Sequence, residues 1–477
     1  MALTAEQINQ LVALFNAGRY AELEIRARVL VEQYPNSGFA WKVLGVCLQV
    51  QGKDGLAALQ KAAELLPDDA DSHSNLGNAL KDLGQLGDAV ASYRRALEIK
   101  PDYAEAHCNL GVALKGLGQL DDAVASYRRA LEIRPDYAEV HNNLGNGLAD
   151  LGQPDDAVAS YRRALKIKPD YAEAHNNLGN ALTDLGQPDD AVASYRRALG
   201  IRPDYAEAYG NLGGALKSQG KLDEALACFQ QQVRLTPGND VAQHQIASLT
   251  GTNTERAPIQ YVESVFDGYA EKFDTHLRQV LSYEAPEKLA ALITQHSTPS
   301  AEKWKVLDLG CGTGLVGLAI APFARQLVGV DLSGKMLEKA RARNLYQRLE
   351  RADLLAMMQG EKASSYDVII AADVFIYLGK LDAVISEIKR LLCPGGVFAF
   401  SIEELVALSN EEAGQGVQRK YQLENTGRYT QSANYMARLA CANGFLLQEM
   451  SAAIIRVEHG KPVNGYLALW KTELHES

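Results

Sequence analysis

The chain has 477 residues, of which 47% are hydrophobic and 22% charged, enough for two or three domains with hydrophobic cores. A formal net charge of -11 disfavours nucleic acid as a partner, because phosphate binding depends on clustered Lys and Arg, and favours a protein, peptide or small molecule. The six cysteines form no C-x-x-C pair, which predicts reduced thiols in the cytoplasm and neither structural zinc nor another metal site. No basic leader or long apolar segment is found, so neither export nor a membrane is expected.

The first half of the chain repeats itself every 34 residues. The unit at residues 169–202 reads PDYAEAHNNLGNALTDLGQPDDAVASYRRALGIR, and the joints between units are prolines: Pro67, Pro101, Pro135, Pro169, Pro203 and Pro237. Each unit has L-G in its first half and A-x-x-x-Y-x-x-A in its second. This pattern resembles the tetratricopeptide (TPR) repeat, which implies an all-α superhelix of stacked helical hairpins. With the weaker units before Pro67, the template predicts about seven hairpins.

The physical reason for a hairpin is visible in one unit. Gly145, next to Leu144, should let the two helices approach closely, and Ala157, Tyr161 and Ala164 have the spacing of one buried helical face. A single hairpin cannot bury this face by itself, so neighbouring units must stack.

An asparagine precedes the L-G pair in five successive units, on the first helix of each hairpin, which lines the concave side of TPR stacks. These residues are Asn75, Asn109, Asn143, Asn177 and Asn211. An amide offers a donor and an acceptor, so such a ladder can bind the backbone of an extended peptide. The same ladder occurs in the TPR arm of O-GlcNAc transferases, which these repeats resemble. Alternatively, the asparagines only cap or space neighbouring repeats.

Two further series also recur every 34 residues. Acidic residues such as Glu105 and Glu139 begin each first helix, where they stabilise the helix dipole and would favour a basic or neutral peptide. Histidines such as His141 and His175 occupy a slot usually taken by a large packing residue, and the repeat spacing is too wide for shared metal ligation.

The period ends after Pro237. Val241 to Gly251 predicts a terminal capping helix, so the repeat domain is expected to cover residues 1–251, followed by a linker at 252–259. Residues 260–477 alternate apolar strands with amphipathic helices, and the last two strands are predicted to form an antiparallel pair. This order predicts a doubly wound α/β domain, similar to the Rossmann fold.

The first strand of this domain ends in the glycine-rich stretch KVLDLGCGTGLVG, Lys305 to Gly317. Its glycines resemble a dinucleotide motif, but Asp308 would repel a pyrophosphate and suits the ammonium of an amino-acid-bearing cofactor. D-x-G-x-G-x-G after a first strand resembles class I methyltransferases, which implies S-adenosyl-L-methionine as the cofactor. The expected loop contacts are Gly310, Cys311, Gly312 and Gly314.

Further cofactor contacts follow in the order of the strands. Asp331, beside Leu332 at the end of the second strand, should accept the ribose hydroxyls. The adenine should meet Met336, Asp353 and the Leu354 backbone, and Asp373 should lie near the methionine part. Each acid alone could equally be a strand-end cap.

A helix with the pattern F-D-x-x-A-x-x-F-D precedes the first strand. In small-molecule members of the fold a similar helix covers the cofactor, so Tyr269 and Phe273 are expected to form a lid; the alternative is a helix packed on the sheet edge. VFDGYAEKFDTHL, AADVFIYLGKL and GRYTQSANYM together resemble bacterial methyltransferases with N-terminal TPR repeats.

No single base is dictated by the chemistry. Glu403 is the first choice, followed by Tyr377, with Glu404 and Asp373 as alternatives and His276 and Arg428 as further residues of the pocket. The sequence after the fourth strand is not N-P-P-Y, and no Pro-Cys nucleophile is found, so the resemblance does not extend to nucleic-acid methyltransferases.

Three functions are compatible with these motifs. In the first, the TPR arm captures a protein or peptide in its groove and presents it to a methyltransferase. In the second, the enzyme methylates a small molecule and the repeats serve assembly. In the third, a TPR scaffold carries an inactive cofactor-binding domain, against which the intact Asp308 and Asp331 argue. The sequence does not indicate an oligomeric state.

Overall fold

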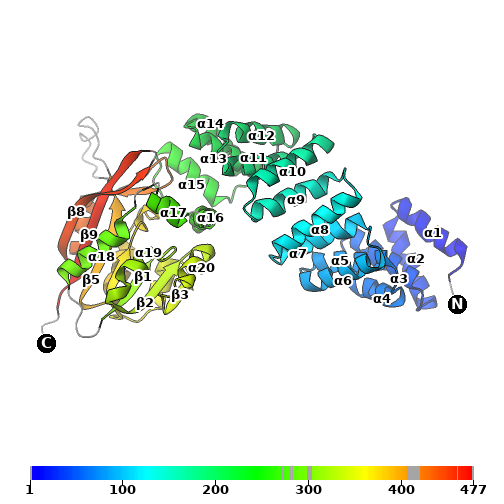
Figure 1. Ribbon diagram of the computed structural model, residues 1–477, viewed down its shortest axis with the longest axis horizontal. Coiled ribbons are helices and arrows are strands. Elements are labelled where there is room, and N and C mark those ends of the chain that lie inside the picture. Colours follow the sequence, from blue (N-terminus) through cyan, green and yellow to red (C-terminus); the bar gives the residue numbers. More distant parts are fainter. Residues whose placement is uncertain are drawn as a thin grey trace. The chain divides into compact units, whose positions relative to one another are not determined.

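The computed structural model divides the chain into two compact units, Met1–Ala225 (unit 1) and Leu226–Ser477 (unit 2), each described by itself below (Figure 1). The structure describes residues 3–270, 273–279, 281, 283–297, 303–405, 419–458 and 460–474. Among these residues, no helix has the length and apolar character needed to cross a bilayer.

Unit 1 is built from consecutive helical hairpins, as the 34-residue period predicts. Its helices are α1 (Ala5–Asn16), α2 (Tyr20–Gln33), α3 (Gly38–Val50), α4 (Leu56–Leu65), α5 (Ala70–Asp82), α6 (Leu86–Ile99), α7 (Ala104–Gly116), α8 (Leu120–Ile133), α9 (Ala138–Asp150), α10 (Pro154–Ile167), α11 (Ala172–Asp184), α12 (Pro188–Ile201), α13 (Ala206–Ser218) and the first residues of α14 (Leu222–Leu235). The hairpins stack side by side into the expected all-α superhelix.

One residue of each hairpin shows why its helices approach so closely. A Cβ on Gly145 of α9 would lie 2.5 Å from Cε1 of Tyr161 on α10, so only glycine leaves room for the tyrosine ring. Ala157, Tyr161 and Ala164 are buried, which confirms the expected face. Gly152, at φ +72°, makes the turn between the helices.

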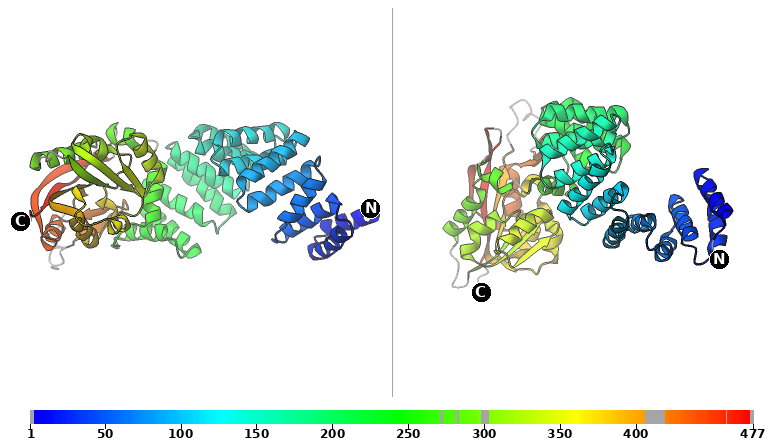
Figure 2. Two further views of the ribbon diagram at one scale, coloured as in Figure 1. Left: turned by 90° about the horizontal axis from the view of Figure 1, so that it is seen from below. Right: turned by 45° about the vertical axis from the view of Figure 1, so that its right-hand side comes forward.

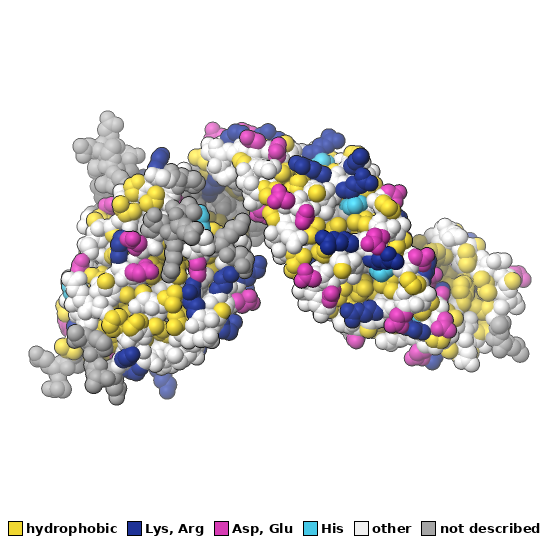
Figure 3. Space-filling view, in the orientation of Figure 1, with side chains coloured by type: hydrophobic (Ala, Val, Ile, Leu, Met, Phe, Trp, Pro, Cys, Tyr) yellow, Lys and Arg dark blue, Asp and Glu magenta, His cyan; other side chains and the backbone are white. Residues whose placement is uncertain are grey.

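Charged side chains of both signs are interspersed over unit 1 (Figure 3). Glu105 accepts from Arg134 at the end of the same 34-residue unit at 2.8 Å, and Glu173 accepts from Arg202 in the same way at 2.7 Å. The repeated histidines, visible along the array in Figure 3, are half-buried, and Nε2 of each bonds the carbonyl of the proline six residues earlier. These two glutamates are therefore paired with arginines inside the array. Each histidine side chain is bonded to the proline that begins its own unit.

Unit 2 contains a seven-stranded mixed sheet in the order β3-β2-β1-β4-β5-β9-β8. Its strands are β1 (Trp304–Leu309), β2 (Ala324–Asp331), β3 (Arg348–Arg351), β4 (Tyr366–Ala371), β5 (Leu392–Glu403), β8 (Phe445–Glu458) and β9 (Lys461–Thr472). The first five are parallel and β9 is antiparallel to both neighbours, which confirms the doubly wound fold and its terminal antiparallel pair. A separate pair joins β6 (Tyr421–Leu423) and β7 (Tyr429–Gln431).

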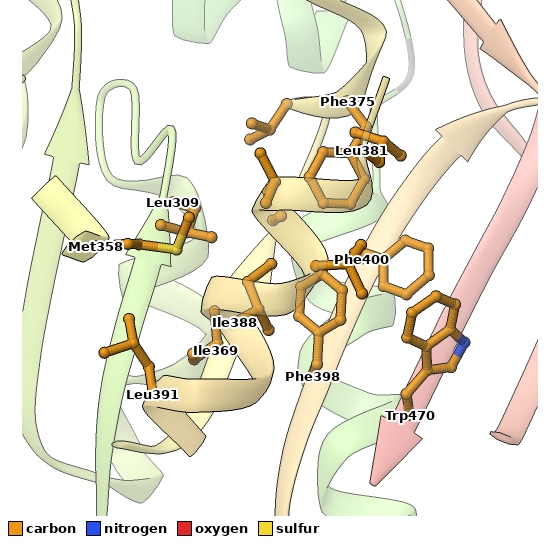
Figure 4. Close-up of a cluster of buried hydrophobic side chains, with 14 of the residues drawn as sticks. Leu309, Met358, Ile369, Phe375, Leu381, Ile388, Leu391, Phe398, Phe400 and Trp470 are labelled. Atoms are coloured by element: carbon orange, nitrogen blue, oxygen red, sulfur yellow. The ribbon is translucent and has the colours of Figure 1, made fainter. Parts of the chain in front are cut away.

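Helices cover both faces of the sheet (Figure 2). Along β1, Val306 packs with α18 (Ala285–His296) and α19 (Leu315–Ile320), while Leu307 and Leu309 pack with α21 (Leu354–Gly360), α22 (Asp382–Leu391) and α23 (Ala433–Ala442). On the second face, Phe398 and Phe400 of β5 meet Trp470 of β9 (Figure 4), with the ring centroids of Phe400 and Trp470 4.8 Å apart. This alternation places Asp308 on the α18 and α19 side.

The helix α15 (Asp240–Thr250) belongs to unit 2, and its inner face is buried against β6 and β7. His244 is 2% exposed and donates from Nε2 to the carbonyl of Gly427 at 3.0 Å. Asn253, in the segment after α15, donates to the carbonyl of Tyr421 and accepts from the backbone of Leu423. These contacts tie α15 and the following segment into the core of unit 2.

Candidate functional site

The glycine loop between β1 and α19 forms the floor of the candidate site. Gly310, Gly312 and Gly314 all have positive φ, at 62°, 52° and 89°, a conformation that other residues rarely adopt. A Cβ on Gly312 would meet only Phe273 Cε1 at 3.9 Å, so the backbone here faces open space. Such a loop lets a ligand come close to the main chain.

Asp331, at the end of β2, braces this loop. Its Oδ2 accepts from the backbone N–H of Gly312 at 2.8 Å and its Oδ1 accepts from the backbone N–H of Ser333 at 2.9 Å. Each oxygen keeps a further lone pair. Burial raises the pKa of the Asp331 carboxyl, against the effect of these hydrogen bonds.

A cavity of about 580 Å³ opens at the carboxyl ends of β1 to β4, the edge where open α/β sheets bind ligands. Most of the predicted site residues line it: Gly310, Cys311, Gly312, Asp331, Leu332, Asp353, Leu354, Asp373, Tyr377, Tyr269 and Phe273. Five predicted residues do not line it: Asp308, Gly314, Met336, Glu403 and the alternative base Glu404. Met336 is fully buried in α20 (Gly334–Ala342), and Glu403 lies behind the cavity wall.

Two short helices, α16 (Ile259–Tyr269) and α17 (Phe273–Gln279), contribute the aromatic wall of the cavity. Asp267 of α16 accepts from the Ser333 hydroxyl at 2.5 Å, and Asp274 of α17 accepts from the Thr313 hydroxyl at 2.5 Å. Asp274 also pairs with Arg343. The two aspartates of the F-D repeats therefore attach both helices to the glycine loop and to the start of α20.

A tyrosine and a histidine from these helices meet at the cavity. The hydroxyl of Tyr269 hydrogen-bonds Nδ1 of His276, and both residues line the cavity. A neutral imidazole nitrogen can accept a proton from such a hydroxyl, so the pair has the elements of a proton relay.

Charged residues form another part of the cavity wall. Arg456 of β8 is 4% exposed and binds three carboxylates: Asp373 from Nη1 at 2.8 Å, Glu458 from Nε at 2.6 Å, and Glu403 from Nη2. Arg428 pairs with Glu458 at 2.8 Å and approaches Glu403 at 3.1 Å. Burial alone would lower the pKa of Arg456, but the carboxylates of Asp373 and Glu403 raise it, so the guanidinium stays charged.

The ion pairs of this network involve Glu403, the residue that the sequence analysis placed first as the catalytic base. Glu403 is buried between two guanidinium groups, and a proton placed on it would cost both ion pairs. Burial raises the pKa of Glu458, but its pairs with Arg428 and Arg456 outweigh burial and lower it. Neither glutamate is arranged to collect a proton from a molecule in the cavity.

Asp353, which the sequence predicts to contact the adenine, makes both a helix cap and an ion pair. Its Oδ1 caps α21 by accepting from the backbone of Leu355 and Ala356, and its Oδ2 pairs with Arg256 at 2.5 Å. Arg256 lines the cavity and comes from the segment between α15 and α16.

Sequence reasoning did not find Arg456 or Arg256, and it named Tyr269 and His276 separately without predicting that they form a pair. No motif surrounds either arginine, and both reach the cavity from segments far along the chain from the glycine loop. A buried arginine inside the apolar strand LQEMSAAIIRVE is the one signal that could have marked Arg456, because an unpaired charge does not remain buried.

In unit 1 the asparagine ladder links successive repeats. Nδ2 of Asn109 donates to Asn78 at 3.0 Å, Nδ2 of Asn177 to Asn142 and Asn146 at 3.1 Å, and Nδ2 of Asn211 to Asn176 at 3.0 Å. Nδ2 of Asn143 approaches Sγ of Cys108, and Asn75 is half-buried on α5. Three of the five amides, those of Asn109, Asn177 and Asn211, are therefore held in fixed orientations by hydrogen bonds to the preceding repeat.

Comparisons with protein-family models find the same two parts. Residues 307–398 match a methyltransferase domain. Residues 58–91, 77–118, 117–152, 142–206 and 182–248 match tetratricopeptide repeats.

Curated relatives are methyltransferases that match part of the chain. Human methyltransferase-like protein 27 is 40% identical over 90 residues, which are 19% of this chain and 36% of that protein. A malonyl-[acyl-carrier protein] O-methyltransferase of Pectobacterium atrosepticum is 28% identical over 47% of this chain and 83% of its own length. A ubiquinone biosynthesis O-methyltransferase of Bordetella avium is 29% identical over 22% of this chain and 46% of its own. The chain spans about a third of the first two curated relatives, 36% and 29%.

Solved structures similar to this chain include TPR proteins. YrrB, described as having an unusual peptide-binding site, is 26% identical with a TM-score of 0.34, over 39% of this chain and 96% of its own. A TPR protein of Thermus thermophilus is 26% identical with a TM-score of 0.33, over 38% and 98% of the two chains.

Proposed function

We propose that this chain, which combines TPR repeats with a methyltransferase domain, transfers a methyl group to a protein or peptide that its TPR arm recruits. A methyltransferase domain implies S-adenosylmethionine as the cofactor. The observation that carries the proposal is the cavity at the carboxyl ends of β1 to β4, where the open glycine loop and Asp331 lie together.

The residues present fit this cofactor. The open space over Gly312 accommodates a ligand against the backbone, and the remaining lone pairs of Asp331 can accept two ribose hydroxyls. Asp353 and Leu354 would hold the adenine. Tyr269 and Phe273 would cover the ligand, with their helices attached through Asp267 and Asp274.

When bound, S-adenosylmethionine supplies an electrophilic methyl group on a sulfonium sulfur. The chain's contribution is to exclude water and to align the acceptor with that carbon, which the aromatic wall and the Arg456 network would do. For an acceptor that loses a proton, Tyr269 Oη would take it while its own proton passes to His276 Nδ1. Tyr377, which also lines the cavity, is the alternative base.

The TPR part of the proposal depends on the asparagine ladder. Because Nδ2 of Asn109, Asn177 and Asn211 is held by the preceding repeat, the orientation of these three amides does not need to be fixed when a ligand binds. We expect their Oδ1 atoms to accept from the backbone N–H groups of an extended peptide.

A second candidate is methylation of a small molecule. The cavity is lined mainly by apolar side chains such as Val262, Leu281 and Pro286, as is common in small-molecule sites. In that case the repeats would serve assembly.

The test uses the full chain, cell lysate and S-adenosylmethionine with a tritiated methyl group, and separates acid-precipitated protein from extractable small molecules. We expect label in the protein fraction, lost with Asp331→Ala. Asn143→Ala combined with Asn177→Ala should reduce protein labelling while S-adenosylhomocysteine binding stays unchanged. The exposed Arg162→Ala is the matched control on unit 1. Label confined to small molecules would support the second candidate, and no cofactor binding would overturn both.

A further inference from the structure

Asp308 is a fully buried carboxylate beneath the glycine loop. It lies on the central strand β1, two residues before Gly310, and is 0% exposed. Its Oδ2 accepts from the hydroxyl of Tyr346 at 2.6 Å, and its Oδ1 has no hydrogen-bond partner among the described residues. A buried carboxylate with one oxygen lacking a hydrogen bond costs free energy when it is ionised. Its presence in the core therefore suggests a functional role.

The surroundings are shaped for Tyr346. A Cβ on Gly317 would lie 2.4 Å from the tyrosine hydroxyl oxygen, and one on Gly329 would lie 2.9 Å from Cε1 of its ring. A Cβ on Gly314 would lie 3.0 Å from its Cε2. Glycines from α19, β2 and the cofactor loop therefore open a slot through which this ring reaches Asp308.

No described cation reaches Asp308. The titratable groups that face it are Tyr346 from the loop before β3, Asp331 of β2, the Cys311 thiol of the glycine loop and Tyr283 before α18. Burial raises the pKa of Asp308 to about 7, the Tyr346 hydrogen bond lowers it, and the charge of Asp331 raises it further.

We propose that Tyr346 is a positioning residue that holds Asp308 as a titrating carboxyl beneath the glycine loop, so that affinity for the cationic cofactor increases with pH. The inference rests on the proposed function, because it needs an ammonium group in the cavity beside the loop. A positive ligand favours the ionised carboxylate, and by linkage the ionised form binds the ligand more tightly. Tyr346 stabilises that ionised form by donating to it.

The test measures S-adenosylhomocysteine binding to the full chain by calorimetry from pH 6 to pH 8, a range in which the ligand keeps its ammonium. A carboxyl that titrates near pH 7 predicts an affinity about tenfold higher at pH 8 than at pH 6. Asp308→Asn should bind with no such slope. Tyr346→Phe removes the hydrogen bond to the ionised form, so the rise in affinity should move to higher pH.

Tyr366→Phe is the matched control. Tyr366 also donates to a carboxylate, Glu361 at 2.8 Å, but it lies at the amino end of β4, away from the glycine loop at the carboxyl ends of the strands, and its loss should leave the pH profile unchanged. If Tyr346→Phe lowers the affinity for S-adenosylhomocysteine by the same factor at every pH, the role of Tyr346 is purely structural and the inference is overturned. A slope retained in Asp308→Asn would do the same, even if Tyr346→Phe fails to fold. Absence of binding to the wild type at every pH would contradict the proposed function, whereas binding without a slope contradicts only this inference.

Discussion

Arg456 holds together the charged wall of the cavity at the scale of a single residue. Three carboxylates from β4's end, β5 and β8 converge on it, and Asp373 is held at φ +55°, a strained conformation for a residue other than glycine. Its guanidinium matches several carboxylates at once, which a lysine could not do.

Arg456→Met should therefore destabilise unit 2 by about 3–5 kcal/mol, because Glu403 would be left buried without its partner. The measurement is urea unfolding followed by tryptophan fluorescence. Arg438→Met, at an exposed position of α23, is the control and should change stability little. Adding Glu403→Gln to Arg456→Met should recover part of the loss, and no recovery would count against the network.

Asp308 should make stability depend on pH without any ligand. Its pKa is about 7 in the folded chain and about 3.9 when unfolded, so the folded state binds the extra proton and stability falls as pH rises from about 4 to 7. Asp308→Asn removes this penalty. We therefore expect the difference in Tm, variant minus wild type, to be larger at pH 8 than at pH 5. Calorimetry of both proteins at the two pH values measures it. An equal difference at both pH values would contradict the expected titration.

The position of the glycine loop after the first strand was predictable because Asp308 and the glycines follow one another along a single strand and turn, whereas its contacts with a cofactor stay a prediction. The sequence could not locate Arg456 or Tyr346, because their roles depend on which segments the sheet brings together. The same limit explains Glu403: its place at the end of β5 was predictable, but its burial between two arginines was not.

At the scale of elements, some glycines of the TPR hairpins make room for a tyrosine ring and others face open space. A Cβ on Gly179 of α11 would lie 2.4 Å from Cε1 of Tyr195, whereas one on Gly200 of α12 would meet nothing within 4 Å. Gly179→Ala should cost about 1–3 kcal/mol by overpacking. Gly200→Ala, its matched control, should gain about 0.5–1 kcal/mol in helix stability.

Circular dichroism at 222 nm during urea unfolding of the full chain distinguishes the two variants. A similar gain in both would mean that helix propensity, and not the tyrosine contact, determines the effect. The repeats were predictable at this scale because each contact recurs every 34 residues, whereas the docking of α15 occurs once and leaves no period to read.

At the scale of the whole molecule, the helix α15 bears on where the methyltransferase domain begins. The sequence places the end of the repeats at residue 251, and this boundary stays a prediction. In the structure, α15 precedes it but belongs by its contacts to unit 2, where His244 and Ala247 pack with Tyr261 and Tyr429. The same cluster includes Tyr377 and Phe266, which line the cavity.

We therefore expect two fragments to behave differently. A fragment of residues 237–477 keeps α15 and its cap Asn239 and should bind S-adenosylhomocysteine like the full chain. A fragment of residues 252–477 loses the helix, exposes the apolar surface around Tyr261, and should melt about 5 °C lower or more, with weaker binding. Calorimetric melting and binding of both fragments test this, with the full chain as the reference. Equal behaviour would place the start of the catalytic unit after α15, and failure of both to bind would mean that the methyltransferase site depends on the repeats themselves.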